Sequence, residues 1–187
     1  ELEELGFPER VCGKLRAFAS APAGLFIVCG PSDSGKTTTL HAMVRHATTR
    51  ARKAVTVEDP VEYTLSEALQ VQARPELGFA IPETLRSVLR HAPDVIMVGE
   101  IRDEETTALA LRAALTGHLV LATLHADSPQ SALARLLNMG ATAVDLATVL
   151  LGVLAQRLAR KRCRCSASSP DARCSRCWGT GYDGRIP

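Results

Sequence analysis

The segment from Gly30 to Thr37 has the sequence Gly-Pro-Ser-Asp-Ser-Gly-Lys-Thr, and it constrains the fold more than any other feature. It matches the phosphate-loop pattern of a glycine, four residues of any type, and then Gly-Lys followed by Ser or Thr. A short apolar run at 25–29 precedes it, and a helical pattern follows. A loop of small residues between a buried strand and a helix lets backbone N–H groups converge on phosphate oxygens. The sequence therefore predicts an α/β nucleotide-binding fold.

Two side chains of this loop have predicted roles in binding a nucleotide. Lys36 can reach the β- and γ-phosphates, and the Thr37 hydroxyl can ligate Mg²⁺. The predicted nucleotide-binding residues are Gly30, Pro31, Ser32, Asp33, Ser34, Gly35, Lys36, Thr37 and Thr38.

Asp33 is an unusual residue for a phosphate-binding loop, because a carboxylate there repels an anionic ligand. Aspartate does tolerate the left-handed backbone conformation better than most non-glycine residues. We expect the Asp33 backbone to serve the loop and its carboxylate to face solvent.

Strand and helix patterns alternate along the chain. Continuous apolar runs predict buried strands at 25–29, 54–57, 95–98 and 119–124, and an alternating run predicts an edge strand at 69–72. Helices are predicted at 8–20, 37–50, 82–91, 104–115, 128–139 and 143–160. Such alternation favours a mostly parallel central sheet with helices on both faces. Near Lys161 the composition changes from Leu and Val to Cys, Arg, Ser and Gly, which predicts a core at 1–160 and a small cysteine-rich appendage at 161–187.

The composition excludes several classes of protein. With 46% hydrophobic and 22% charged residues the chain is an ordinary globular one, and its net charge of +2 gives no sign of nucleic-acid or membrane binding. The basic run at 157–164 is interpreted as a solvated helix end. No apolar run reaches eighteen residues, and no signal peptide opens the chain. The two ends look like the interior of a sequence, so we expect an excised segment of a longer protein.

Acidic residues follow two of the predicted strands. Glu100 comes after the strand at 95–98, at the end of a parallel sheet where ligands bind, so it could hold Mg²⁺ through water or orient an attacking water. Gly99 beside it permits close approach of the chain to the phosphates. Glu58, Asp59 and Glu62 follow the strand at 54–57. They form either a solvated turn or a second metal-binding or water-orienting element.

Histidines and arginines offer further candidates. His125, at the carboxyl end of the strand at 119–124, could sense the γ-phosphate, whereas His118 at its start is either structural or faces a neighbouring site. Arg86 and Arg90 lie four residues apart on one helix face, and Arg102 follows Glu100 closely. These arginines are either solvated or stabilise the γ-phosphate charge, in this subunit or an adjacent one.

Four of the six cysteines lie within fifteen residues of one another. Without export signals, that clustering favours a metal over disulfides. The pair Cys174 and Cys177 has ordinary zinc spacing, and the pair Cys163 and Cys165 is one residue tighter. Four thiolates suit a structural tetrahedral Zn²⁺ site, and the alternative is a set of reduced cysteines without metal.

Four motifs in order resemble those of the type II secretion and type IV pilus assembly ATPases, the GspE, PilB and PilT superfamily. They are the phosphate loop at 30–40, an aspartate box at 56–63, a Walker B element at 93–103 and a histidine box at 116–125. The segments 155–158 and 179–185 also fit the pattern of this superfamily.

The resemblance implies a RecA-like P-loop ATPase core that works as a hexameric ring. It implies that Glu100 is the main catalytic carboxylate and that Glu58 and Glu62 lie near the metal and the attacking water. It makes Arg86 and Arg90 candidate phosphate-sensing arginines. Members have a further domain before the core that completes the nucleotide clamp, so this segment alone should be weakly active. The retraction branch lacks the cysteine module, which favours an assembly or secretion motor.

Two positions depart from the superfamily pattern. Asp33 stands where glycine is usual, which bears on loop geometry and nucleotide affinity. Ala92 precedes Pro93 where the superfamily usually has an acid.

The sequence therefore predicts ATP hydrolysis that powers type II protein secretion or type IV pilus assembly. ATP, Mg²⁺ and structural Zn²⁺ are the expected cofactors. The expected partners are five further copies in a homo-hexamer, together with inner-membrane platform and cytoplasmic-domain proteins, with no direct contact to nucleic acid. The expected location is the cytoplasm, peripheral to the inner membrane. The alternatives are a related conjugation or DNA-uptake ATPase, and a nucleotide-binding scaffold with little turnover.

Overall fold

Six parallel strands form the central sheet of the computed structural model, which describes residues 1–48, 52–165 and 174–187. The strand order is β3-β2-β4-β5-β1-β6, and all five pairings are parallel. The strands are β1 (Gly24–Cys29), β2 (Ala54–Glu58), β3 (Leu69–Gln72), β4 (Val95–Val98), β5 (Leu119–Leu124) and β6 (Leu150–Ala155). The predicted parallel sheet and the edge position of β3 are confirmed.

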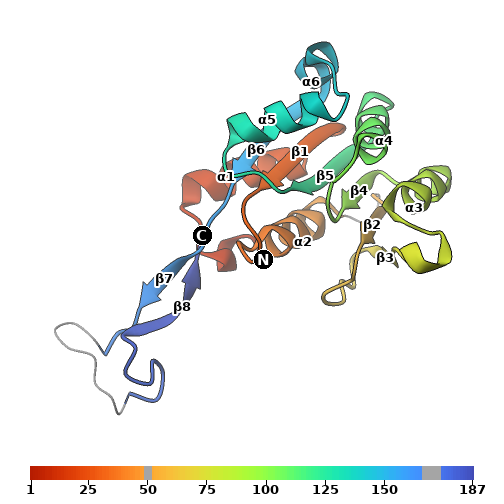
Figure 1. Ribbon diagram of the computed structural model, residues 1–187. Coiled ribbons are helices and arrows are strands. Elements are labelled where there is room, and N and C mark those ends of the chain that lie inside the picture. The colour runs from red at the N-terminus through yellow and green to blue at the C-terminus, as the bar shows by residue number, and fades with distance from the viewer. Residues whose placement is uncertain (49–51, 166–173) are drawn as a thin grey trace.

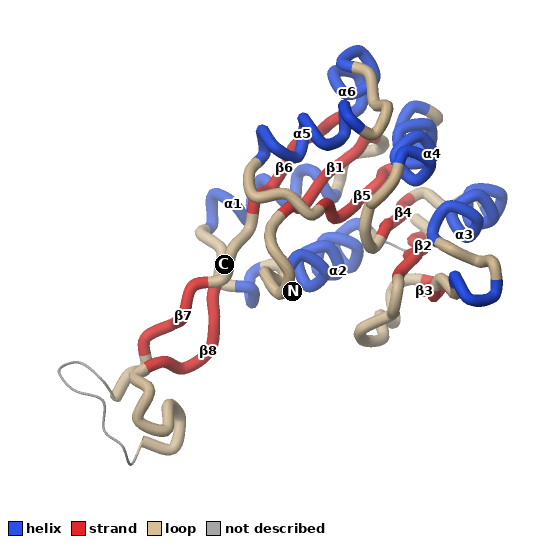
Figure 2. The backbone as a smooth tube through the Cα atoms, viewed as in Figure 1, coloured by secondary structure: helices blue, strands red, loops and turns tan. Residues whose placement is uncertain are grey.

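Helices cover both faces of this sheet, with α1 and α2 on one face and α3 to α6 on the other (Figures 1 and 2). The helices are α1 (Glu9–Ala19), α2 (Lys36–Ala47), α3 (Ile81–Val88), α4 (Glu104–Leu115), α5 (Pro129–Asn138) and α6 (Ala143–Val149), and short 3-10 turns occupy Glu3–Leu5, Pro75–Leu77 and Leu89–His91. The predicted C-terminal end of the helix at 37–50 lies outside the described residues. None of the helices in the described ranges has the length and hydropathy that a membrane crossing requires.

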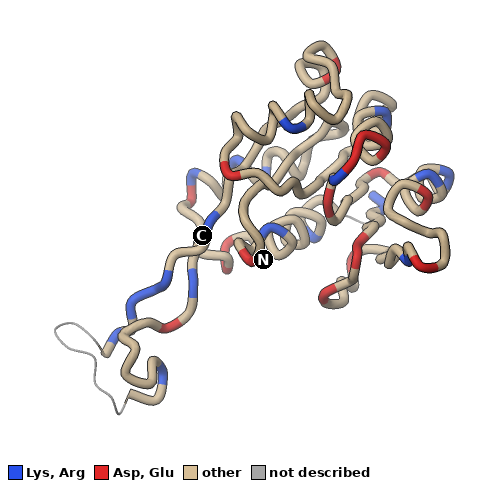
Figure 3. Tube along the Cα trace, viewed as in Figure 1, with Lys and Arg blue, Asp and Glu red and all other residues tan. Residues whose placement is uncertain are grey.

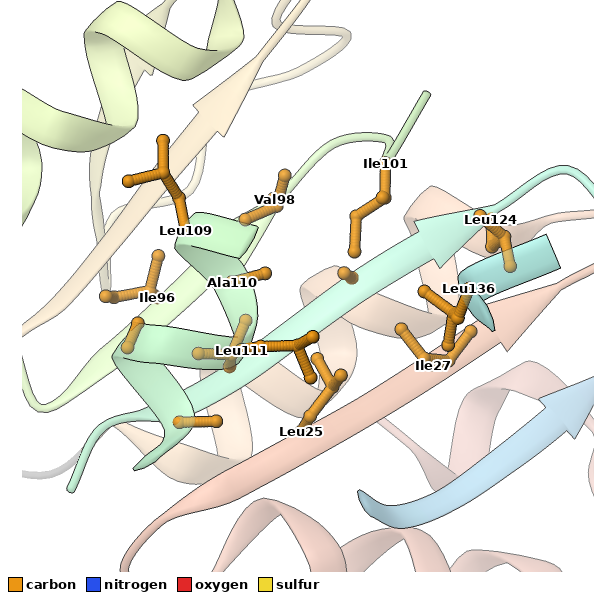
Figure 4. Close-up of a cluster of buried hydrophobic side chains, with 14 of the residues drawn as sticks. Leu25, Ile27, Ile96, Val98, Ile101, Leu109, Ala110, Leu111, Leu124 and Leu136 are labelled. Carbon is orange, nitrogen blue, oxygen red and sulfur yellow. The ribbon is translucent and has the colours of Figure 1, made fainter. Parts of the chain in front are cut away.

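The two faces of the sheet hold separate hydrophobic clusters, because successive side chains of a strand point to opposite sides. Leu25 and Ile27 of β1 point toward α4 and α5, as Figure 4 shows. Phe26 and Val28 of the same strand belong to the cluster under α1 and α2. All six residues of β1 are buried, which explains why the run is apolar on both faces.

The prediction of one helix over 143–160 is wrong in its second half. The helix ends at Val149, and residues 150–155 form β6, which pairs with β1 in parallel register. A short Leu- and Val-rich run suits either a buried helix or a strand, and the sequence pattern does not distinguish them. The open edge of β1 decides in favour of the strand, because pairing there satisfies the backbone N–H and C=O groups of both segments.

The chain then leaves the sheet as an antiparallel two-stranded arm, β7 (Ala159–Arg162) paired with β8 (Tyr182–Ile186). The arm projects from the core in Figure 1, and Figure 3 shows Lys and Arg along it. The basic run at 157–164 is therefore on a strand in its middle part, and its interpretation as a helix end is wrong. The predicted domain boundary after residue 160 stays a prediction, and β7 begins at Ala159.

Candidate active site

A cavity of about 470 Å³ opens at the carboxyl ends of the sheet strands, which is where the sequence placed the site. Segments from distant parts of the chain meet there. The cavity is lined by residues 32–38 after β1, by Glu58 at the end of β2 with Asp59, Pro60 and Glu62 after it, by Gly99, Glu100 and Arg102 after β4, and by Ile81, Thr123 and Leu158.

The phosphate loop has the features that an anionic phosphate needs. Gly35 has φ of +83°, and α2 begins directly after it, so the backbone N–H groups of its first turn have no intrahelical acceptor. The Lys36 ammonium donates to the carbonyl oxygens of Gly30 at 3.1 Å and Pro31 at 2.7 Å. The Ser34 hydroxyl is buried and has no hydrogen-bond partner. These donors fit a nucleotide phosphate chain.

Asp33 has φ of +58°, so its backbone does adopt the left-handed conformation that the sequence led us to expect. The residue is exposed, as expected, and it also lines the edge of the cavity. Because this φ is close to the ordinary left-handed value, Asp33 replaces glycine with a moderate conformational penalty.

Glu100 lies in the cavity with one quarter of its side chain exposed, and Arg102 holds it. The Nε and Nη2 atoms of Arg102 each lie 2.8 Å from Oε2 of Glu100. This bond raises the pKa of the Arg102 guanidinium above its ordinary value. The Thr123 hydroxyl donates to the Gly99 carbonyl at 2.5 Å, which ties the turn that carries Glu100 to β5. The position of Glu100 is therefore set by two neighbouring strands.

Glu58 lies against the cavity but is only 2% exposed, and both of its carboxylate oxygens accept hydrogen bonds. His41 of α2 is 2.9 Å from Oε2, and the hydroxyl of Thr56 and the amide of Gln70 donate to Oε1 at 2.7 and 3.0 Å. Burial raises the pKa of Glu58, but these hydrogen bonds outweigh it, so the net pKa lies below the ordinary value. Glu58 thus links α2 to β2 and β3.

Glu62 and Asp59 have a different environment from Glu58. Both are exposed, and both line the cavity. Of the acids that follow β2, these two have carboxylates that are free to rotate toward a metal or a water at the cavity surface.

Three predicted catalytic residues do not line this cavity, and neither do Gly30 and Pro31 of the predicted nucleotide-binding set. His125 is exposed, and its carbonyl accepts a hydrogen bond from Arg135. Arg86 of α3 forms an ion pair with Glu105 of α4, and Arg90 lies in the 3-10 turn that follows α3. The roles of His125, Arg86 and Arg90 stay predictions. Each role requires a γ-phosphate or an adjacent subunit close to the residue.

His118 lies at the start of β5, far along the strand from the cavity end. Its Nδ1 atom is 3.0 Å from the Ala113 carbonyl and 3.3 Å from the Thr116 hydroxyl. These contacts attach β5 to the end of α4, which supports the structural alternative for this histidine.

Gln156 contacts the phosphate loop and was absent from the predicted site. It follows β6 and is 4% exposed. Its Nε2 donates to the Ser34 carbonyl at 2.7 Å, and its Oε1 accepts from the Thr39 hydroxyl at 2.8 Å. Gln156 was missed because the sequence pattern predicted a helix at 143–160, and a polar residue near the end of a helix is expected to face solvent. The strand β6 delivers Gln156 under the loop instead.

The four clustered cysteines converge at the end of the β7–β8 arm. The Sγ atoms of Cys163, Cys165, Cys174 and Cys177 all lie within 4.8 Å of one another, and none forms a disulfide. Backbone N–H groups of Cys177 and Arg176 lower the pKa of Cys174 to about 6, and hydrogen bonds among the thiols, that with Cys163 foremost, raise the pKa of Cys165 to about 12. Four thiols this close fit one tetrahedral cation, for which sulfur atoms lie about 3.8 Å apart.

The whole chain, residues 1–187, matches the family described as type II/IV secretion system protein. It is 46% identical to the type II secretion system protein HxcR of Pseudomonas aeruginosa, covering 98% of this chain and 40% of that protein. It is 40% identical to the type IV pilus assembly ATPase PilB of Thermus thermophilus, covering 99% and 24%. The chain thus spans less than half the length of these relatives.

The fold is also similar to that of a solved structure. The pilus retraction motor PilT with bound ADP superimposes with a TM-score of 0.74 at 35% sequence identity, covering 86% of this chain and 49% of that one.

Proposed function

The chain belongs to the type II/IV secretion system protein family, and from that premise we propose that its cavity binds and hydrolyses ATP to power secretion or pilus assembly. The observation that carries this proposal is the convergence of Lys36, Thr37 and Glu100 on one cavity. An ammonium and a helix N-terminus would neutralise the phosphates, and the carboxylate that follows β4 would orient the attacking water.

The residues of the cavity suggest how each contributes to the reaction. The Thr37 hydroxyl would be a ligand of Mg²⁺, which would supply positive charge against the phosphates. Glu100, held by Arg102, would orient the water or the hydration shell of the metal. Glu62 and Asp59 would complete that acidic side, and the buried Glu58 attaches β2 to α2 through His41.

The working assembly proposed for the longer protein is a homo-hexamer at the cytoplasmic side of the inner membrane. Arg86 and Arg90, which do not line the cavity of their own chain, are both exposed, on α3 and on the turn after it. Their exposure supports a role toward a neighbouring subunit or toward the partner proteins of the machine.

Full-length protein containing this chain is expected to release phosphate from ATP in the presence of Mg²⁺ and to stop when EDTA removes the metal. Phosphate release is measured with and without the other proteins of the machine. The loss of exported protein or of surface pili in cells that lack the protein then tells which process it powers. Binding of Mg-ATP without phosphate release would favour the scaffold alternative and contradict the proposal.

The cysteine cluster is proposed to hold one structural Zn²⁺. The proximity of four sulfur atoms supports it, as does the low pKa of Cys174, because thiolates are the form that binds zinc. With four protein ligands no position is left for substrate, so the metal would stabilise the end of the arm and take no part in hydrolysis.

Purified protein is expected to contain about one zinc per chain, and Cys177→Ser should lower that content at least fivefold, because three thiolates bind zinc less tightly. Elemental analysis by mass spectrometry measures it. Cys12→Ser is the matched control, since Cys12 is buried in α1 and should leave the zinc content unchanged. Zinc-free protein purified without chelators would contradict the proposal.

A further inference from the structure

A single glutamine from a distant strand lies against the phosphate loop, and we propose that Gln156 is a positioning residue for nucleotide binding. It lies 122 residues from Ser34 in sequence yet contacts its carbonyl directly. The proposal rests on the proposed function in one respect only, namely that the ligand is a nucleotide.

The side chain of Gln156 connects the loop to the helix that follows it. Its Nε2 donates to the Ser34 carbonyl and its Oε1 accepts from Thr39, which lies in the first turns of α2. The Gln156 backbone N–H donates to the Cys29 carbonyl at 2.8 Å, at the end of β1. One residue thus bonds to the segments before, within and after the loop. The side-chain amide supplies the donor for the Ser34 contact and the acceptor for the Thr39 contact.

The two glycines of the phosphate-loop motif, Gly30 and Gly35, are packed against this glutamine. A Cβ atom at Gly30 would lie 2.3 Å from the Gln156 carbonyl oxygen, and one at Gly35 would lie 2.8 Å from the Gln156 Nε2. Both distances are far below van der Waals contact. The glycines therefore permit the close approach of Gln156, in addition to any approach of phosphate.

The bond to Ser34 fixes the direction of a neighbouring donor. In a trans peptide the C=O and the following N–H point in opposite directions. With the Ser34 carbonyl held by Gln156, the Gly35 N–H points away from Gln156, and Gly35 lines the cavity. Without that bond the peptide unit between Ser34 and Gly35 is free to rotate, and the donor is no longer pre-oriented for a phosphate oxygen. The structure thus assigns to Gln156 an indirect role in affinity, with no contact to the nucleotide itself.

Two substitutions test this role in the full-length protein. Gln156→Leu keeps the volume of the side chain and removes both of its hydrogen bonds. Gln156→Glu keeps the shape but replaces Nε2 with a carboxylate oxygen, which repels the carbonyl oxygen of Ser34. Each is expected to raise the Kd and KM for Mg-ATP at least tenfold, while kcat at saturating ATP changes less than threefold. Gln130→Glu on α5 is the matched control, because Gln130 is exposed and lies outside the cavity lining, and its Kd should equal that of the parent.

A double-mutant cycle separates positioning from a general loss of stability. Thr39→Val removes the donor to Oε1 and leaves the Ser34 bond, so we expect a rise in Kd of about threefold. In the Gln156→Leu background, Thr39→Val should raise the Kd little further, because both substitutions remove the bond between Thr39 and the Gln156 amide. Should the Gln156 variants fail to fold, Thr39→Val alone remains informative.

Several outcomes would overturn the role of Gln156. They are an unchanged Kd in the folded variants, a loss in kcat with KM unchanged, and fully additive effects in the cycle. If the parent protein bound Mg-ATP without hydrolysing it, the proposed function would be contradicted. The role of Gln156 could still be tested, because the Kd for Mg-ATP does not depend on hydrolysis.

Discussion

Replacing Lys36 by alanine is expected to weaken Mg-ATP binding about 100-fold, or ~3 kcal/mol. The carboxylates around the cavity outnumber the cations, so the ammonium is the main positive charge that faces the phosphates. The carboxylates are those of Asp33, Glu58, Asp59, Glu62 and Glu100, and the cations are Lys36 and Arg102. Arg102 is committed to Glu100. The substitution also frees the carbonyl groups of Gly30 and Pro31 that the ammonium now holds.

Isothermal titration or a fluorescent ATP analogue measures this loss in the full-length protein. Lys14→Ala is the matched control, because Lys14 is an exposed residue of α1 outside the cavity lining, and its affinity should match the parent. If Lys36→Ala bound Mg-ATP as tightly as the parent, the cavity would not be the nucleotide site.

Glu100→Gln is expected to lower ATP turnover by about 10²- to 10³-fold, which lies within the range by which a positioned acid or base accelerates a reaction. The amide keeps the size of the side chain but loses the charge that orients water or metal. Binding of Mg-ATP should stay within about threefold of the parent or tighten, because one negative charge leaves a cavity rich in carboxylates.

Single-turnover hydrolysis, measured beside equilibrium binding, separates the two effects. Glu104→Gln is the control, since Glu104 is an exposed residue in the first turn of α4 and does not line the cavity. Turnover in Glu100→Gln equal to that of the control would mean that another acid, such as Glu62, orients the water.

Glu58 at the end of β2 and Glu62 in the segment after it show what a sequence motif leaves undecided. Both Glu58 and Glu62 were predicted to lie near the metal and the water. In the folded chain Glu58 has its oxygens occupied by His41, Thr56 and Gln70, whereas Glu62 is exposed in the cavity lining. A motif fixes their spacing, but only the packing of α2 and β3 against β2 determines which carboxylate is free.

The predicted phosphate-sensing residues show the same limit. Arg86, Arg90 and His125 were predicted from their helix spacing, their strand end and the resemblance. None of the three lines the cavity of this chain. The sequence of one chain does not give the position of a second subunit. The roles of Arg86, Arg90 and His125 therefore depend on how the subunits assemble.

The sequence alone determined the phosphate loop, the parallel sheet with helices on both faces, the acid at the end of β4 and the convergence of cysteines. Each of these follows from local periodicity or fixed spacing, which a linear chain encodes directly. The tertiary structure decided the fate of residues 150–156. A Leu-rich run suits helix and strand equally, and the free hydrogen-bonding edge of β1 made it β6. That pairing is what placed Gln156 under the loop, a contact across 122 residues that no local pattern contains.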